Sequence, residues 1–130
     1  MTPNLLRHIH RLCHRAWADH AAQLGLSFSE FEYLSVIHDE EERMRIEDGH
    51  GQHLQDIVSV LGVAKASASA MISKLEARGL VGRFQCRQDA RAQHIVLTEQ
   101  GQALMQRGGG LYAQIARNMS SNIKDDLDEL

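Results

Sequence analysis

Proline is almost absent from this sequence, with Pro3 the single example in 130 residues. Long helices are therefore permitted along most of the chain, because proline is the residue that most strongly interrupts them. Cysteine is also scarce, and Cys13 and Cys86 lie far apart in the sequence. Small secreted scaffolds that depend on disulfides carry more cysteines, so we do not expect a disulfide framework.

Long hydrophobic runs and targeting segments are missing as well. No apolar run reaches the roughly 20 residues that a transmembrane helix needs. The N-terminal stretch MTPNLLRHIHRLCHRAW mixes charged and apolar residues too early for a signal peptide. We therefore expect a cytoplasmic protein with no membrane partner. The length suits one domain, or one domain whose outer helices pack against a second copy.

The familiar sequence signatures of catalytic sites are also missing. The chain contains no glycine-rich phosphate-binding loop, no nucleophile elbow and no metalloprotease motif with two histidines. We therefore expect neither an enzyme nor a bound cofactor.

Positive charge is concentrated in one part of an acidic chain. The total charge is −3 with histidine neutral. Between Lys65 and Arg91 the sequence has six basic and two acidic residues, so this segment carries +4 and the remainder carries −7. Local basic charge of this kind is expected of a phosphate-binding surface, although a solvated helix face followed by a charged loop would give the same pattern.

Apolar residues at spacings of three and four predict two helices in the first part of the chain. The first covers residues 4–24 and ends at Gly25. Ser27 and Glu30 form an S-x-x-E capping box ahead of the second helix, FEYLSVI. The first part of the charged stretch HDEEERMRIEDGHGQH can extend this helix, and we expect the acidic run 39–42 to be a solvated helix end.

Two shorter helices follow, over residues 54–61 and about 64–78, and they stop at Gly62 and Gly79. Two short helices joined by a glycine-containing turn predict a helix-turn-helix. The apolar positions of the first helix are Leu5, Leu6, Ile9, Leu12, Cys13, Ala16 and Trp17. The residues expected to be buried are Phe31, Leu34 and Ile37 in the second helix and Ala68, Met71, Ile72 and Leu75 in the fourth.

After Leu80 the apolar pattern changes to the alternation of a strand. The segments VGRFQ and QHIVL, joined by polar residues, predict a β-hairpin. A helix-turn-helix followed directly by a hairpin is a winged helix, and its wing would carry Arg83, Arg87 and Arg91. Thr98 is expected to cap a fifth helix, which glycines 108–110 could kink, and SSNIKDDLDEL begins a further amphipathic helix.

Three short motifs stand in order within residues 54–101. They are LEARGLV, the Asp-x-Arg wing motif Asp89-Ala90-Arg91, and LTEQG. Each is weak alone, but their order and spacing together are fairly specific. On these motifs the chain resembles the MarR family of transcriptional regulators.

The resemblance implies a mainly α fold with a small β-hairpin wing, in a single MarR-like domain over residues 1–130. In this fold a winged helix-turn-helix of about 30–98 stands between dimerisation helices of about 4–24 and 98–130. Family members are homodimers that grip a pseudo-palindromic operator in double-stranded DNA. Many are repressors released by small phenolic or aromatic ligands, by thiol oxidation or by metal.

By resemblance, the helix 65–78 enters the major groove, Arg91 reaches the minor groove and Asp89 helps to hold it. The outward face of this helix lacks the Arg, Asn and Gln side chains that read bases by paired hydrogen bonds, so we expect modest base readout. Basic side chains would supply affinity, and DNA shape would supply part of the specificity. The expected DNA-contacting residues are Lys65, Ser67, Ser69, Ser73, Lys74, Arg83, Arg87, Asp89 and Arg91.

The sequence departs from the family pattern at several positions. Ala64 stands where a serine or threonine often caps the recognition helix, which removes about 1 kcal/mol of capping. Ala90 occupies a wing position that is often arginine. The chain also ends where the last dimer helix of the family normally continues.

His10, Cys13 and His14 form H-x-x-C-H on the first helix, where offsets of three and four place them on nearly one face. This spacing could hold zinc, which would make the protein a metal-sensing regulator. Cys13 could instead be a sensor thiol, activated by its basic neighbours, or an inert buried residue. A further alternative is a winged-helix protein-interaction module without DNA binding. The small, nearly neutral outward face of the helix 65–78 and the negative net charge of the chain are consistent with this alternative.

Overall fold

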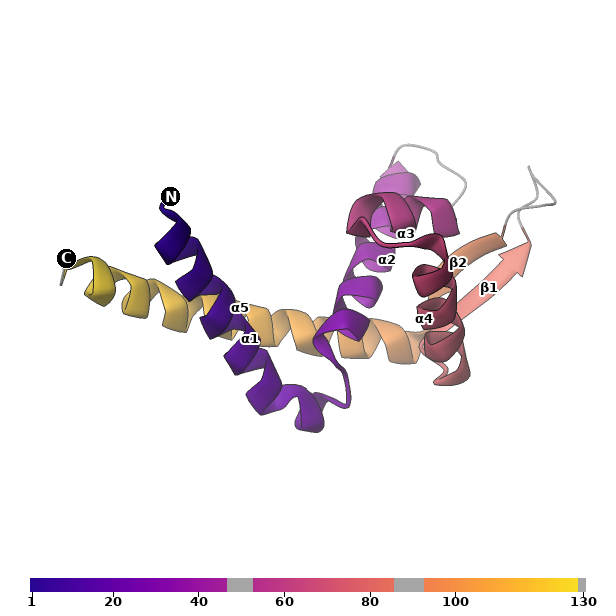
Figure 1. Ribbon diagram of the computed structural model, residues 1–130. Helices are drawn as coiled ribbons and strands as arrows, with labels where there is room; N and C mark the ends of the chain where they lie inside the picture. Colours follow the sequence, from indigo (N-terminus) through magenta and orange to yellow (C-terminus); the bar gives the residue numbers. More distant parts are fainter. Residues whose placement is uncertain (47–52, 86–92, 129–130) are drawn as a thin grey trace. The chain divides into compact units, whose positions relative to one another are not determined.

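Five helices and a two-stranded antiparallel hairpin make up the part of the chain that the computed structural model describes (Figure 1). This part is the backbone of residues 1–46, 53–85 and 93–128, with the side chains of residues 1–43, 53–85 and 93–120. The elements are α1 (Pro3–Leu24), α2 (Phe28–Ile46), α3 (Leu54–Leu61), α4 (Lys65–Ala77), β1 (Val81–Gln85), β2 (Gln93–Leu97) and α5 (Glu99–Asp128). The expected mainly α fold with a small hairpin wing is confirmed.

Short local signals fix where several helices begin and end. Thr2 caps α1, because its Oγ1 accepts a backbone N–H of the first turn at 3.2 Å. Gly25 and Gly62 end α1 and α3 with φ of 66° each, the left-handed conformation that glycine adopts most readily. The Oγ1 of Thr98 accepts the N–H of Gly101 at 3.0 Å, which confirms the expected cap of α5.

The end of α4 determines where the wing begins. Gly79 follows the helix with φ of 76°. The N–H groups of Gly79 and Leu80 donate to the carbonyls of Glu76 and Leu75 at 2.9 and 3.0 Å. These two bonds form a Schellman motif, which reverses the chain direction within two residues. The first strand therefore starts directly beside the helix that precedes it.

The chain divides into two compact units. The first consists of residues Met1–Phe28 and Gln106–Leu130, and the second of residues Ser29–Met105. The second unit holds the helix-turn-helix and the hairpin. The first unit holds α1 and the later part of α5.

Trp17 is the centre of packing in the first unit. Its side chain is buried, and its Nε1–H donates to the carbonyl of Leu26 at 3.4 Å. The indole meets the ring of Phe28 edge-on, with centroids 5.9 Å apart, and lies 5.5 Å from the ring of Tyr112 on α5. Aromatic contacts of this geometry add to the energy of apolar burial, so this cluster fixes α1 against α5.

The rest of the apolar stripe of α1 is incompletely buried. Trp17 is the one residue of α1 that the structure buries. Leu6 is 58% exposed, and Leu5, Ile9 and Leu12 are half-buried. A single copy of the chain therefore leaves much of this apolar stripe outside a core. The apolar surface that stays accessible is unusual for a helix with such regular spacing.

The core of the second unit follows the sequence pattern closely. Phe31, Leu34 and Ile37 of α2 are buried as expected. On α4, Ala68, Ile72 and Leu75 have no exposed surface, whereas Met71 is half-buried. The hairpin pairs Val81 with Leu97 and Gln85 with Gln93 in antiparallel register. Val81, Leu80 and Ile95 join this core from the hairpin side.

Helix α5 corrects two expectations. Glycines 108–110 do not kink it into two helices, and no separate helix begins near residue 120, because one helix runs from Glu99 to Asp128 (Figure 1). An interior glycine costs about 1 kcal/mol relative to alanine, which weakens a helix without breaking it. Buried Met105, Leu111 and Ile115 on either side of the glycines compensate for this cost through packing.

No single helix in the described part of the chain is long and apolar enough to cross a membrane. Only the bent pair of α3 and α4, at 115°, meets the length and composition requirement together.

Candidate nucleic-acid interface

Helix α4 has one buried face and one open face. Its inward residues are fully buried, as described above, whereas the opposite face carries small side chains. Ala66, Ser67, Ala70, Ser73 and Lys74 are exposed, and Ser69 is half-buried. The chain turns by 115° between α3 and α4, within the range of helix-turn-helix pairs. A slim, open helix face held at this angle can approach the floor of a DNA groove closely.

The first turn of α4 is not capped by a side chain. Ala64 holds the N-cap position and makes no side-chain hydrogen bond to the helix, as its sequence predicts. The N–H groups of the first turn lack an intrahelical partner, and the helix dipole makes this end positive. Lys65 is exposed at the same end. This end of the helix therefore suits a phosphate group.

Arg83 connects the wing to α4. Its Nη2 donates to the Oγ of Ser73 at 2.8 Å, and its Nε lies 3.5 Å from the Oε1 of Glu76. The side chain is only 21% exposed. The structure thus brings two of the expected DNA-contacting residues, Arg83 and Ser73, together. It also gives Arg83 an acidic partner, so this arginine positions the wing beside the helix as well as contributing charge.

A second ionic cluster lies at the other end of α4. The carboxylate of Glu30 on α2 is buried and accepts a hydrogen bond from Arg78. The Nζ of Lys74 lies 3.9 Å from the same carboxylate, with a side chain that is 59% exposed. Sequence reasoning missed this cluster because it assigned Glu30 to a capping box, and the arginine stands 48 residues away.

The remaining expected DNA contacts cannot be placed from the described residues. Arg87, Asp89 and Arg91 lie outside the described residues, as does Cys86. The last described pair of the hairpin is Gln85 with Gln93.

Comparison with known proteins decides the family. A model of the MarR family matches residues 26–92, which is more than half of the chain and includes α2, α3, α4 and β1. The chain belongs to the MarR family. Members of this family are DNA-binding transcriptional regulators and not enzymes.

Solved structures share the fold of this MarR-family chain at low sequence identity. The S. aureus MepR–DNA complex is 19% identical with a TM-score of 0.73, and the match covers 100% of this chain and 99% of MepR. CouR from Rhodococcus jostii RHA1 bound to p-coumaroyl-CoA is 18% identical with a TM-score of 0.70, covering 95% and 86%. Bordetella bronchiseptica BpsR, whose DNA binding is regulated by 6-hydroxynicotinic acid, is 21% identical with a TM-score of 0.70, covering 91% and 78%.

The acidic run of α2 corrects one further expectation for this MarR-family chain. Asp39 is exposed, but Glu41 is half-buried and its Oε1 accepts the backbone N–H of Leu97 at 2.8 Å. Burial raises the pKa of the Glu41 carboxyl above its ordinary value of 4.5, and the hydrogen bond from Leu97 and the nearby His38 only partly offset this effect. The run is therefore not simply a solvated helix end, because Glu41 ties α2 to the wing strand β2.

The raised pKa of Glu41 gives a stability prediction with a defined sign. A carboxyl whose folded-state pKa is raised favours the fold while it is protonated, and this contribution is lost as the pH rises through the folded-state pKa. We expect Glu41→Gln to keep the hydrogen bond to Leu97 without the charge. Urea midpoints from about pH 4 to pH 7 should fall for the wild type relative to Glu41→Gln, with a modest difference on the order of 0.5 kcal/mol.

Glu40→Gln is the matched control for this test, because Glu40 pairs with Arg43 on the same helix, whereas Glu41 bonds to the strand β2. A wild-type midpoint that rises relative to Glu41→Gln over the same pH range would show that the hydrogen bond, rather than burial, dominates at this carboxyl.

A cluster of rings joins the wing to the start of α3. His94 on β2 is buried and stacks on its register partner Phe84, with centroids 4.8 Å apart. The ring of His53, at the N-cap of α3, meets His94 edge-on at 4.9 Å. The backbone N–H of His53 donates to the carboxylate of Asp56 at 2.9 Å. The base of the hairpin is thus held against the helix-turn-helix by α3 and, through Glu41, by α2.

The expected sensor residues lie in the first unit. Cys13 is a free thiol and half-buried, and His10 and His14 are exposed. Within residues 1–43, 53–85 and 93–120, no group of three or more His, Cys, Asp and Glu side chains is arranged to hold a metal ion. The described residues therefore give no support to the metal-sensing alternative, and a redox role for Cys13 stays a prediction.

Proposed function

We propose that this chain acts as a homodimeric repressor that binds a pseudo-palindromic operator and leaves it when a small aromatic effector binds. The observation that carries the proposal is the open face of α4 with the wing fixed beside it, in a chain of the MarR family. DNA complexes of MepR and CouR have the same fold, which supports a DNA-bound state for this chain.

In this proposal, α4 lies in the major groove and the wing lies over the adjacent minor groove. The alanines of the open face contact thymine methyl groups, and the serines hydrogen-bond to bases or phosphates with little selectivity. Specificity then depends partly on DNA shape, and affinity depends on phosphate contacts. The residues proposed to contact DNA are Lys65, Ser67, Ser69, Ser73 and Lys74 from α4, and Arg83, Arg87, Asp89 and Arg91 from the wing.

The incompletely buried apolar surface of α1 supports a homodimer. Leu6 is more than half exposed, and Leu5, Ile9 and Leu12 keep accessible surface in the single chain. Burial of such surface against a second copy is favourable by about 25 cal/mol per Å². A twofold dimer would also place two winged units on one DNA duplex, which a pseudo-palindromic operator requires.

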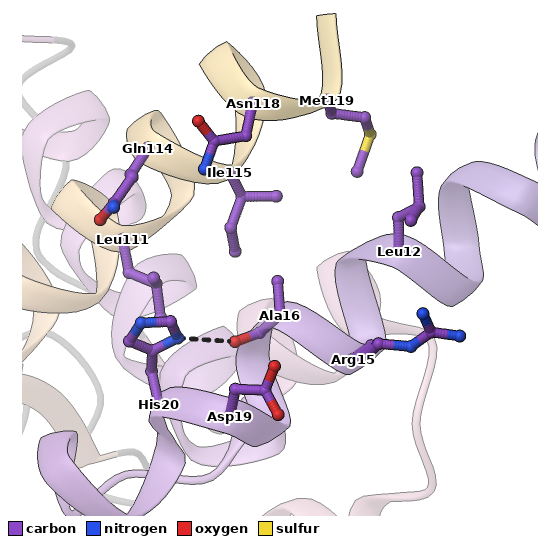
Figure 2. A pocket seen from close by; sticks show the side chains of 10 residues that line it. All are labelled: Leu12, Arg15, Ala16, Asp19, His20, Leu111, Gln114, Ile115, Asn118 and Met119. Atoms are coloured by element: carbon purple, nitrogen blue, oxygen red, sulfur yellow. Dashed lines mark hydrogen bonds between the residues drawn. The ribbon is translucent and has the colours of Figure 1, made fainter. Parts of the chain in front are cut away.

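A groove in the first unit supports the effector part of the proposal (Figure 2). It has a volume of about 220 Å³ and lies between α1 and α5. Its apolar lining is Leu12, Ala16, Leu111, Ile115 and Met119, and its polar lining is Arg15, Asp19, His20, Gln114 and Asn118. An apolar cleft with a few polar groups suits a flat ring that bears a polar substituent.

His20 gives this groove a defined hydrogen-bonding group. Its Nδ1–H donates to the carbonyl of Ala16 at 2.9 Å, because a carbonyl oxygen can only accept. With Nδ1 as the donor, the neutral tautomer of the ring would offer Nε2 as an acceptor, which suits a phenolic hydroxyl. CouR and BpsR, which share the fold, have p-coumaroyl-CoA and 6-hydroxynicotinic acid as ligands, and both contain an aromatic ring.

Arg91→Ala tests the DNA-binding part of the proposal. We expect operator binding to weaken by about 10- to 100-fold, because one arginine contact in a groove is worth about 1–3 kcal/mol. The melting temperature should stay within about 1 °C of the wild type, because the proposed role of Arg91 is to contact DNA and not to stabilise the fold. Fluorescence anisotropy with a labelled operator measures the affinity.

Arg117→Ala is the matched control, because Arg117 is an exposed arginine of α5 in the first unit. Unchanged operator affinity in Arg91→Ala would show that this wing arginine does not contact DNA. Sedimentation of the same complex reports whether two chains bind one duplex, and addition of aromatic acids to it reports an effector.

A further inference from the structure

Helix α5 is anchored in both units, and its glycine run stands between the two anchors. In the second unit, Gly101 packs against the backbone of Leu80 and Met105 is buried. In the first unit, Leu111 and Ile115 are buried. Glycines 108–110 lie between these anchors, and the first of them is the third residue after the unit boundary at Met105/Gln106.

Packing does not explain two of these glycines. A Cβ built on Gly109 or Gly110 would meet no atom within 4 Å, so neither position needs the absence of a side chain. Among the described residues the glycines with positive φ are Gly25, Gly62 and Gly79, so neither position needs an unusual backbone conformation either. What remains is the direct effect of glycine on a helix, which is to make it easier to open and bend.

The other covalent connection between the units has a different character. The chain passes from the first unit to the second at Phe28/Ser29, at the first residue of α2. The residues just before it, Gly25–Ser27, are not helical. Of the described helices, α5 is thus the one whose interior crosses the boundary. A helix is a stiff rod, so its glycines decide how easily the two units can change their relative orientation.

We propose that glycines 108–110 form a hinge in α5 that lets the DNA-binding unit reorient relative to the unit containing α1. An effector releases an operator only if it binds one arrangement of the protein better than another. A hinge lowers the free-energy cost of the second arrangement, because Gly109 and Gly110 are exposed and have no side-chain packing to lose. The use of this hinge for regulation rests on the proposed function, whereas the hinge itself rests on α5 alone.

The first test is amide hydrogen exchange along α5 in the wild type and in Gly109→Ala/Gly110→Ala. In the wild type, the amides at 108–114 should exchange faster than those on either side. The double variant should slow this exchange on the order of tenfold or more. The new methyl groups enter open space, so the variant is expected to fold. Equal exchange rates along all of α5 in the wild type would overturn the hinge.

The second test measures the reorientation directly. Spin labels at Ala22→Cys in the first unit and Ser59→Cys in the second, in a Cys13→Ala/Cys86→Ser background, report the distance between the units. Dilution of the labelled chain with unlabelled chain isolates distances within one copy. We expect a broad distance distribution that becomes narrower in Gly109→Ala/Gly110→Ala. A distribution of unchanged width would contradict the proposal.

Ala113→Gly is the matched control, because it adds an exposed glycine to α5 outside the gap between the anchors. It should lower the stability of the helix but leave the width of the distance distribution unchanged. Operator binding of the wild type separates the two proposals. Failure to bind DNA would contradict the proposed function, and the exchange and distance data alone would then decide whether the hinge exists. Normal DNA binding together with a rigid α5 would contradict only the hinge.

Discussion

Gly101→Ala is expected to lower the free energy of unfolding by about 3 kcal/mol or more and the melting temperature by about 10 °C. A Cβ at this position would lie 2.0 Å from the carbonyl oxygen of Leu80 and 3.0 Å from its carbonyl carbon. Both atoms belong to the backbone, which cannot rotate away as a side chain can. The start of α5 would have to move off the turn between α4 and β1, where Thr98 also bonds to Gly79.

Gly109→Ala on the same helix is the matched control for this substitution. It should raise the free energy of unfolding by about 1 kcal/mol, because alanine favours the helix and its methyl group meets nothing. Calorimetry of the two variants should therefore give shifts of opposite sign. A Gly101→Ala protein as stable as the wild type would show that α5 does not approach Leu80 this closely.

Arg78→Met is expected to destabilise the second unit by about 2–3 kcal/mol. Glu30 is buried, and removal of one partner of a buried ion pair leaves an uncompensated charge, which typically costs about 3–5 kcal/mol. The expected cost of Arg78→Met is smaller than this typical range, because the arginine side chain is 35% exposed and Lys74 remains 3.9 Å from the carboxylate. Urea unfolding followed by circular dichroism measures the loss.

A double-mutant cycle with Glu30→Gln separates the ion pair from packing. If the cost arises from the orphaned carboxylate, Arg78→Met should be much milder when Glu30 is already glutamine. Lys74→Met is the control, since its contact with the same carboxylate is longer and more exposed. Additive effects of Arg78→Met and Glu30→Gln would mean that the two side chains do not interact in solution.

Local signals made most of the secondary structure predictable. The helix 54–61 and both strands were expected with the bounds that the structure shows. Glycines at helix ends and the change of period after Leu80 carry this information, because each acts over a few residues. The continuous α5 was not predictable from the same rules. A run of three glycines suggests a kink, and the helix continues because apolar side chains on both sides of the glycines are buried.

The side-chain contacts between distant segments of the site could not be predicted from the sequence. The acidic run around Glu41 suggests a solvated carboxylate, but this carboxylate accepts a hydrogen bond from the backbone N–H of Leu97, 56 residues away. The position of Arg83 on the wing suggests a cation that is available to DNA, but its guanidinium interacts with Ser73 and Glu76 of α4. Such pairs depend on the tertiary placement of side chains far apart in sequence, which periodicity does not encode.

The most direct test of DNA recognition is fluorescence anisotropy of the chain with the DNA that flanks its own gene, beside a random duplex of equal length, at about 50–200 mM salt. We expect selective binding by two chains per duplex, with log K falling linearly as log salt rises. Arg91→Ala should reduce this slope by about 1 per wing. Weak binding without preference for the flanking DNA, and with a flat salt dependence, would contradict a DNA-binding repressor and favour a winged-helix protein-interaction module.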